Sequence, residues 1–239
     1  LRRHAGILTN AQAVLLITVA KAKGVARLLK AQVEVLRDVV TPEELTAPAE
    51  SFRRYAVQGR DIAFVQYTSG STGQPKGVVR DNGGHAVAMH WTMKNIYNVD
   101  PGDVYWAASD VGWVVGHSYI VYAPLISGCT TIMYEGKPVR TPDAGAFWRV
   151  LAQHKVKSFF VAPTAFRAIK KEDPDAHLRR QYDISTLRTL YLAGERLDPP
   201  TYEWLAQVLA SGHHVRVIGE RARERRLIPA IVPADMARD

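Results

Sequence analysis

Apolar residues along this chain gather in short runs, separated by glycine-rich turns and by segments with a helical period. Five of these runs predict strands, and they lie at residues 62–67, 104–108, 130–134, 158–162 and 187–192. Two further segments place apolar residues at helical spacing, and they lie at residues 145–153 and 201–210. Strands that alternate with helices predict an α/β domain in which helices cover the sheet.

The first 60 residues predict one strand-then-helix step and a surface linker. Residues 13–19 form a short apolar run, and apolar residues then recur at helical spacing from Val25 to Val40. Thr41 and Pro42 form a helix start with proline at the first helical position. The polar stretch that continues to residue 60 is expected on the surface. We therefore expect a βα segment with a linker at 1–60 and the main core at 61–210.

Residues 211–239 predict a basic tail of unknown structure. They begin with Ser-Gly-His-His and then carry four arginines, Arg221, Arg223, Arg225 and Arg226. A basic amphipathic or nucleic-acid-binding arm has such a composition, but so does a solvated or poorly ordered terminus, and we favour the terminus. The neighbouring histidines His213 and His214 lack the further ligands at regular spacing that a metal site needs, so no metal site is predicted.

The composition is that of an ordinary globular chain, with 47% hydrophobic and 23% charged residues. The chain has 31 Lys and Arg against 23 Asp and Glu, and this net charge of +8 suits a nucleotide, a coenzyme, a nucleic acid or an anionic lipid as partner. Cys129 is the single cysteine, so no intrachain disulfide can form, and a reducing, cytoplasmic compartment is expected. No apolar run approaches the roughly 20 residues of a membrane span.

A segment rich in glycine and hydroxyl groups directly follows the predicted strand at 62–67. Residues 67–77 have the sequence Tyr-Thr-Ser-Gly-Ser-Thr-Gly-Gln-Pro-Lys-Gly. Glycines let the backbone turn tightly with its N–H groups inward, hydroxyls add donors, and lysine adds a mobile positive charge. The segment therefore predicts a cradle for phosphate oxygens, formed by Thr68, Ser69, Gly70, Ser71, Thr72, Gly73, Lys76 and Gly77. A Walker A loop is excluded because Gly77 follows Lys76 instead of preceding it.

This loop resembles the phosphate loop of the adenylate-forming acyl-CoA synthetases, whose pattern is Tyr-Thr-Ser-Gly-Ser/Thr-Thr-Gly-x-Pro-Lys-Gly. The likeness continues in five further segments, at residues 81–85, 106–117, 134–138, 162–165 and 193–196. Within the family, residues 61–209 are most similar to propionyl-CoA synthetases, the close relatives of acetyl-CoA synthetase. The resemblance implies an α/β fold that forms part of the large N-terminal domain of these enzymes, with a sheet flanked by helices.

The resemblance also implies the chemistry of an ATP-dependent, AMP-forming acid–CoA ligase. A carboxylate and ATP would give an acyl-adenylate and pyrophosphate, and the CoA thiol would then displace AMP. Mg²⁺, backbone N–H groups and Lys76 would neutralise the charge that develops on the phosphate oxygens. By the same resemblance, Thr68 to Thr72 and Lys76 hold the β- and γ-phosphates, and Thr68, Lys76 and His117 act in catalysis. The adenine site is expected to be lined by Gly194, Glu195 and Arg196.

Three apolar residues lie where related enzymes enclose the alkyl end of the acid: Val114, Val115 and Ala193. Acetyl-specific relatives usually have valine at the position of Ala193. The smaller alanine leaves room for one more methylene, which is worth about 1–3 kcal/mol and predicts a preference for propionate over acetate. For Val114 and Val115 a plain core-packing role stays open, and His117 fits either a place beside the reacting groups or a hydrogen-bonded core position.

Several parts of the family pattern are missing from this sequence. It has no Thr-Glu pair, its Thr-Gly lies only in the phosphate loop, and no lysine follows Lys171. In the family these features help to hold the nucleotide and Mg²⁺, bind the ribose, and drive adenylation from a C-terminal domain. That domain is therefore expected to be absent, and catalysis by this chain alone is expected to be incomplete.

Two other interpretations stay open. Residues 1–66 resemble the fatty-acyl-AMP ligase branch more than the propionyl-CoA branch, and residues 211–239 match neither, which indicates a fragment or a composite chain. The sequence could then belong to a fatty-acyl-AMP ligase, or to an inactive protein, which either still binds ATP or CoA or is a nonfunctional truncated chain. The expected partners are ATP, CoA and a small carboxylic acid, propionate or acetate, with no nucleic acid and no membrane span; the fatty-acyl-AMP ligase interpretation implies a long fatty acid instead.

Overall fold

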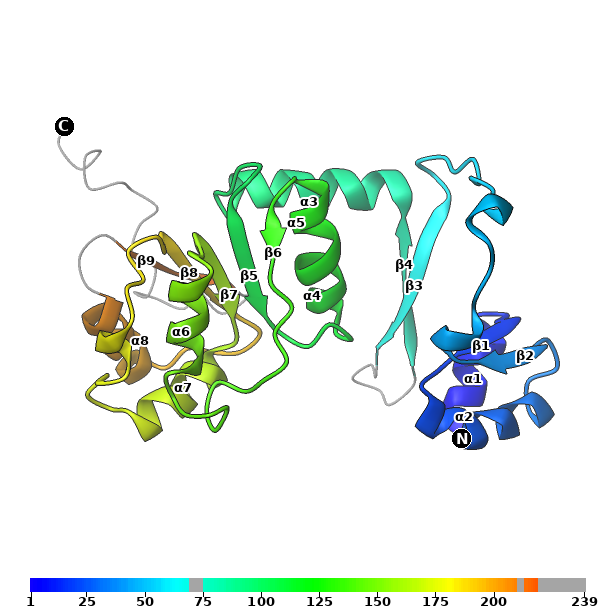
Figure 1. The fold of residues 1–239 in the computed structure, drawn as a ribbon, viewed down its shortest axis with the longest axis horizontal. Helices are drawn as coiled ribbons and strands as arrows, with labels where there is room; N and C mark the ends of the chain where they lie inside the picture. Colours follow the sequence, from blue (N-terminus) through cyan, green and yellow to red (C-terminus); the bar gives the residue numbers. More distant parts are fainter. Residues whose placement is uncertain (69–74, 210–212, 219–239) are drawn as a thin grey trace. The chain divides into compact units, whose positions relative to one another are not determined.

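The computed structural model describes residues 1–68, 75–209 and 213–218. The chain divides into two compact units, Leu1–His85 and Ala86–Asp239 (Figure 1). The two units are described separately below. In the part of the chain that the structure describes, no helix combines the length and the apolar character needed to cross a bilayer.

The first unit opens with a small α/β layer. Its elements in chain order are α1 (Arg2–Asn10), β1 (Leu15–Ile17), α2 (Ala20–Arg27), η1 (Leu28–Ala31) and β2 (Asp38–Val40). Strands β1 and β2 pair in parallel, with Leu16 opposite Val39. Six residues form the core of this layer: Ala5, Ala26, Leu29, Val33, Leu36 and Val39.

This layer confirms a strand within 13–19 but corrects the helix predicted from Val25 to Val40. The helical region ends at Ala31, and Val39 and Val40 belong to β2. The apolar spacing was misleading because Val33, Leu36 and Val39 are buried in one core although they come from a loop and a strand. Helix α1 was not predicted, because it buries only Ala5 and so has a weak apolar pattern.

The linker begins with the predicted helix start. Thr41 caps the short 3₁₀ helix η2 (Pro42–Glu44), and its backbone N–H donates to Glu44 Oε2 at 2.8 Å in a capping box. Lys23 of α2 also donates to the Glu44 carboxylate. A second 3₁₀ turn, η3 (Ala49–Ser51), follows, and the side chains described between residues 42 and 60 are exposed as predicted.

The unit ends with an antiparallel hairpin of β3 (Ile62–Thr68) and β4 (Lys76–Asp81). Their register places Thr68 opposite Lys76, so the two ends of the predicted phosphate loop lie side by side on neighbouring strands. The Tyr67 hydroxyl donates to Asn10 Oδ1 at 2.5 Å and connects this hairpin to α1. Strand β4 was not predicted, because its charged residues gave it no apolar run.

The second unit is built on a five-stranded, all-parallel sheet of order β6-β5-β7-β8-β9. Its strands are β5 (Val104–Ala108), β6 (Thr130–Thr131), β7 (Ser158–Val161), β8 (Thr189–Ala193) and β9 (His214–Ile218). Its longer helices are α3 (Asn82–Asn95), which contains the boundary between the units, α6 (Ala146–Gln153), α7 (Pro163–Glu172) and α8 (Pro199–Leu209). Its shorter ones are α4 (Val114–Gly116), η4 (His117–Tyr122), α5 (Ala123–Ile126) and η5 (Arg179–Gln181).

Helices cover both faces of this sheet, as predicted (Figure 1). Alternate residues of each strand point to opposite faces. Trp106, Phe159 and Leu190 pack against α6, α7 and α8 on one face. Tyr105 and Tyr191 pack against α3 and η4 on the other face. The α/β fold class is therefore confirmed.

The elements of this unit agree with the sequence in part. The four strands predicted in this unit occur, although the one predicted at 130–134 forms ladder pairs only at Thr130 and Thr131, and the fifth predicted strand, at 62–67, is β3 of the first unit. Helices α6 and α8 were predicted, whereas α3 and α7 were not. Strand β9 lies inside the region predicted as a basic tail, and its pairing with β8 corrects that prediction for residues 214–218.

Candidate functional site

A cavity of about 650 Å³ opens in the second unit at the carboxyl ends of the parallel strands. Ala108 and Asp110 follow β5, and Val161 ends β7. Tyr134, beyond β6, and Ala165, from the first turn of α7, complete the wall. In open α/β sheets ligands bind at this edge, because the loops after neighbouring strands converge there. The cavity is therefore the candidate substrate site of this unit.

The segment between Asp110 and His117 lies beside this cavity in a tightly packed turn. The Asp110 side chain accepts the Gly112 N–H at 2.7 Å. A Cβ atom on Gly116 would lie 2.1 Å from the Asp110 carbonyl oxygen and 2.5 Å from Val111 Cα. Only glycine allows this close approach of two backbone segments. The chain then enters η4, a π-helix, a rare geometry that occurs frequently at functional sites.

The residues predicted for the acyl pocket pack against the apolar cluster of α3 and η4. Val115 and Ala193 contact this cluster, and Val114 is half-buried in α4. None of the three lines the cavity of 650 Å³. The core-packing role that stayed open for Val115 is therefore present, while its role toward the acid remains a prediction. His117 is half-buried, and its Nδ1 lies 3.3 Å from the Trp113 carbonyl oxygen.

Buried tyrosines form much of the cluster that Val115 and Ala193 contact. Tyr105 and Tyr191 are completely shielded from solvent. Burial raises the pKa of both phenols, so they stay neutral at physiological pH. The Tyr191 hydroxyl donates to the Ile96 carbonyl oxygen at 2.5 Å, which fixes the ring next to Ala193. The side chains that contact Val115 and Ala193 are therefore mainly apolar or neutral, and Arg216 of β9 lies opposite Tyr191.

The predicted adenine segment, Gly194 to Arg196, is a turn that α7 holds in place. Gly194 has a φ of +96°, which favours glycine. Glu195 accepts the Thr164 N–H at 2.6 Å and the Thr164 hydroxyl at the amino end of α7. The Glu195 carboxylate also pairs with Arg167 Nη2 at 2.5 Å. The amino end of α7 and the guanidinium of Arg167 thus both contact the Glu195 carboxylate.

Arg167 is a site residue that the sequence reasoning missed. Its Nη1 donates to the Arg196 carbonyl oxygen at 3.1 Å and lies 3.4 Å from Asp198 Oδ2. One guanidinium thus contacts both the turn and the start of the segment that follows it. A signal was present, because Arg167 comes two residues after the family segment at 162–165 and one helical turn after Pro163.

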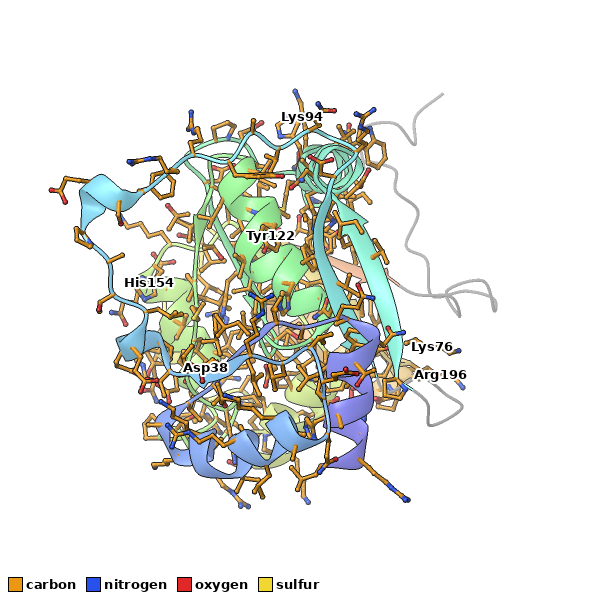
Figure 2. All side chains as sticks on the ribbon, turned by 90° about the vertical axis from the view of Figure 1, so that its right-hand side faces the viewer. Asp38, Lys76, Lys94, Tyr122, His154 and Arg196 are labelled. Carbon is orange, nitrogen blue, oxygen red and sulfur yellow. The ribbon has the colours of Figure 1, made fainter. Side chains whose placement is uncertain are left out.

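The predicted phosphate loop is described only at its two ends. Ser69, Gly70, Ser71, Thr72 and Gly73 lie outside the described residues. Thr68 is half-buried at the end of β3. Lys76 begins β4 with an exposed side chain, and Gly77 follows it in the strand (Figure 2).

Metal-binding side chains do not cluster in the described ranges. Among residues 1–68, 75–209 and 213–218, no three His, Cys, Asp or Glu side chains gather as ligands for one ion. Cys129 is buried, and its thiol donates to the Asp100 carbonyl oxygen at 3.4 Å. Burial raises the pKa of this thiol, which makes it a poor nucleophile and metal ligand.

Comparisons with known proteins extend the resemblance to nearly the whole chain. A family model described as AMP-binding enzyme matches residues 1–219, and so includes both the opening segment and β9. An uncharacterized protein of Pseudomonas aeruginosa is 57% identical over 165 residues, which cover 69% of this chain and 26% of that protein. The human mitochondrial acyl-CoA synthetase short-chain family member 3 is 55% identical over 172 residues, which cover 72% of this chain and 25% of that protein.

A third relative is named by its reaction. The propionate–CoA ligase of Salmonella typhimurium is 50% identical over 153 residues, which cover 64% of this chain and 24% of that enzyme. The chain thus spans about a quarter of the length of these relatives. Because the family model matches more than half of the sequence, the chain belongs to the AMP-binding enzyme family.

Proposed function

We propose that this chain supplies the phosphate loop and a substrate cavity of an ATP-dependent ligase that joins a short-chain carboxylic acid to coenzyme A. The observation that carries the proposal is the 650 Å³ cavity at the carboxyl ends of β5 and β7, bordered by segments that the acyl-CoA synthetases share. The names of the human and Salmonella relatives support the same class of substrate.

The reaction would proceed in two steps, formation of an acyl-adenylate and then transfer of the acyl group to coenzyme A. A carboxylate oxygen attacks the α-phosphorus of ATP, and the bond to pyrophosphate breaks. The thiolate of coenzyme A then attacks the acyl carbon, and AMP leaves with the electron pair of the acyl–oxygen bond. Mg²⁺ supplies positive charge to the phosphates when it is bound, and we assign it no ligand among the described residues.

The side chains of this chain would act mainly by position and charge. Thr68 is the last residue of β3, and Lys76 is the first residue of β4. The pairing of these two strands therefore fixes the distance that the phosphate loop must span. From there Lys76 places a cation near the β- and γ-phosphates, where it stabilises developing negative charge. His117, at the start of the π-helix, is the candidate for contact with the reacting carboxylate or phosphates.

The nucleotide base and the acyl chain would bind to the second unit. We propose that Gly194, Glu195 and Arg196 face adenine, with Glu195 held by Thr164 and Arg167. Val114, Val115 and Ala193 would enclose the alkyl end of the acid. The side chains around Val115 and Ala193 are mainly apolar or neutral, which suits propionate, since one methylene is worth about 1–3 kcal/mol in such a pocket.

Calorimetry with ATP and Mg²⁺ tests the phosphate site. The unaltered chain should bind, and Lys76→Ala should weaken binding by about tenfold or more, because a charge-assisted contact to phosphate is lost. Lys94→Ala is the matched control, since Lys94 is an exposed lysine of α3 (Figure 2). No heat with the unaltered chain, or equal binding by Lys76→Ala, would contradict the proposal.

A chimera tests the substrate class. Residues 1–196 of this chain are joined to the remaining part of the Salmonella ligase, and release of AMP is measured with propionate, acetate and a twelve-carbon acid. Propionate should be the best substrate, and Ala193→Val should shift the preference toward acetate by about 1 kcal/mol or more, roughly fivefold. A chimera that prefers the long acid would instead support a fatty-acyl-AMP ligase.

A further inference from the structure

A second pocket of the second unit lies outside the features described so far. It has a volume of about 330 Å³ and lies between the segment that follows α7 and one face of α8. Arg179 and Arg180 contribute its charged wall, and Trp204, Gln207 and Val208 of α8 contribute the opposite wall. It shares no lining residue with the cavity at the ends of β5 and β7.

The segment that forms this pocket is held in one conformation. The buried carboxylate of Asp173 accepts the backbone N–H groups of His177 at 2.8 Å and Leu178 at 2.9 Å. Ala176 has a φ of +54°, a strained value for a residue with a side chain. The Trp204 indole N–H donates to the Pro174 carbonyl oxygen at 2.6 Å, which fixes the segment to α8. The pocket is therefore formed before any ligand arrives.

The two guanidinium groups of the pocket are poorly neutralised. Arg179 is half-buried: its Nη1 donates to the Tyr182 carbonyl oxygen at 3.1 Å, and its buried Nε finds no acceptor. Among the described residues, no carboxylate oxygen lies within 4.0 Å of either guanidinium. Asp175, in the pocket wall, lies 3.6 Å from His177 Nε2, and His177 Nδ1 lies 3.5 Å from Arg180 Nη1.

The surroundings of Arg179 disfavour the charged form of its guanidinium group. Burial lowers its pKa, and the more distant Asp183 offsets this only in part. A half-buried cation without a paired carboxylate is costly, and an anion beside it restores the missing interaction. Guanidinium groups bind carboxylate and phosphoryl oxygens through two parallel hydrogen bonds. The positive charge of the pocket and the hydrogen-bonding geometry of its guanidinium groups therefore both favour a ligand with a carboxylate or a phosphoryl group.

We propose that this pocket binds a small molecule with an oxyanion, held by Arg179 and Arg180, and an apolar part, held against Trp204 and Val208. The anionic group is a phosphoryl or a carboxylate group, which share this chemistry. Gln207 adds an amide that can donate to the same oxygens. The pocket shares no residue with the proposed phosphate loop, so the proposal does not rest on the proposed ligase reaction.

Nuclear magnetic resonance of the indole N–H groups provides a local test. The chain has five tryptophans, and Trp204→Phe identifies the Trp204 resonance. The ¹⁵N-labelled chain carrying Lys76→Ala, which removes the lysine of the phosphate loop, is titrated with sodium phosphate, with sodium propionate, and with sodium chloride at equal ionic strength. Phosphate or propionate should move the Trp204 resonance and reach saturation, whereas chloride should not. The salt that saturates at the lower concentration identifies the phosphoryl or the carboxylate class.

Arginine variants decide whether the two guanidinium groups hold the anion. Arg180→Gln, at an exposed residue that can change without disturbing the fold, should weaken binding by about tenfold. Arg179→Gln should weaken it at least as much, provided that its other resonances remain native. Arg188→Gln is the matched control, because Arg188 is exposed and does not line the pocket. The absence of a saturable shift with both anions, or equal affinity in Arg180→Gln, would overturn the proposal.

Discussion

The close packing at Gly116 leads to a sharp prediction for Gly116→Ala. The added Cβ would lie 2.1 Å from the Asp110 carbonyl oxygen, and real Cβ atoms essentially never come within 3.0 Å of another heavy atom. The two backbone segments must therefore separate by about 0.9 Å. The atoms in the way belong to the backbone of Asp110 and Val111, which cannot rotate aside as a side chain can. We expect a loss of about 2–4 kcal/mol in the free energy of unfolding of the second unit.

Urea unfolding followed by tryptophan fluorescence measures this loss. All five tryptophans lie between residues 86 and 239, so their fluorescence reports on the second unit. At a slope near 2 kcal/mol per M, the midpoint should fall by about 1–2 M. Gly112→Ala is the matched control in the same segment. Its Cβ would meet only the side-chain oxygen of Asp110 at 3.1 Å, so its midpoint should change by less than about 0.5 M. Equal midpoints for the two variants would refute the reasoning.

Two further predictions concern single carboxylates. The Lys23 hydrogen bond, followed by the Thr41 N–H, lowers the pKa of Glu44 from 4.5. At about pH 7 the unaltered chain should therefore have a higher melting temperature than Glu44→Gln, measured by far-UV circular dichroism. This difference in melting temperature should vanish as the pH falls through the lowered pKa of Glu44. A difference that stays the same as the pH falls from neutral into the strongly acidic range would be contrary to this. Glu195→Gln should lower the unfolding free energy by about 1 kcal/mol in the tryptophan assay, because the partly exposed ion pair with Arg167 is lost. An unchanged midpoint would mean that this pair does not stabilise the turn.

The sequence predicted the sheet of the second unit well, because its central strands are buried on both faces. Residues 158–161 are all buried, and three of them, Phe159, Phe160 and Val161, form a continuous apolar run. Residues 130–134 show the limit of this reasoning. Ile132 and Tyr134 pack against the core, yet the backbone leaves the sheet after Thr131. Apolar composition reports burial, whereas strand length depends on the neighbouring strand.

Two strands were missed because neither β4 nor β9 contains an uninterrupted apolar run and each is completed by its pairing partner. Strand β4 carries Lys76, Arg80 and Asp81 and is defined by its pairing with β3, which no local pattern reveals. Strand β9 begins with His214 beside arginine-rich sequence, and it becomes a strand because the edge of β8 offers unpaired backbone groups. Long-range hydrogen bonding thus overrides local composition at both positions.

The candidate site was predictable only where a motif carries the chemistry. The phosphate loop and the adenine turn at Gly194 were predicted from residue type and resemblance and stay predictions, and the partners that hold the turn were not predicted. Arg167 and Glu195 are 28 residues apart in the sequence. They meet because β7 and β8 are neighbours, so the segments after them converge at the same sheet edge. Contacts of this kind follow from topology and are absent from any local pattern.

The order of strands in the second unit has a consequence for synthesis on the ribosome. Each new strand in the chain pairs with an edge of the sheet that has already formed: β6 and then β7 pair with the two edges of β5, β8 joins β7, and β9 joins β8. A chain that emerges with its amino end first can therefore extend the sheet one strand at a time, without opening a pair that has already formed. A pause in translation after β8 would leave β8 as the growing edge of the nascent sheet, ready to pair with β9.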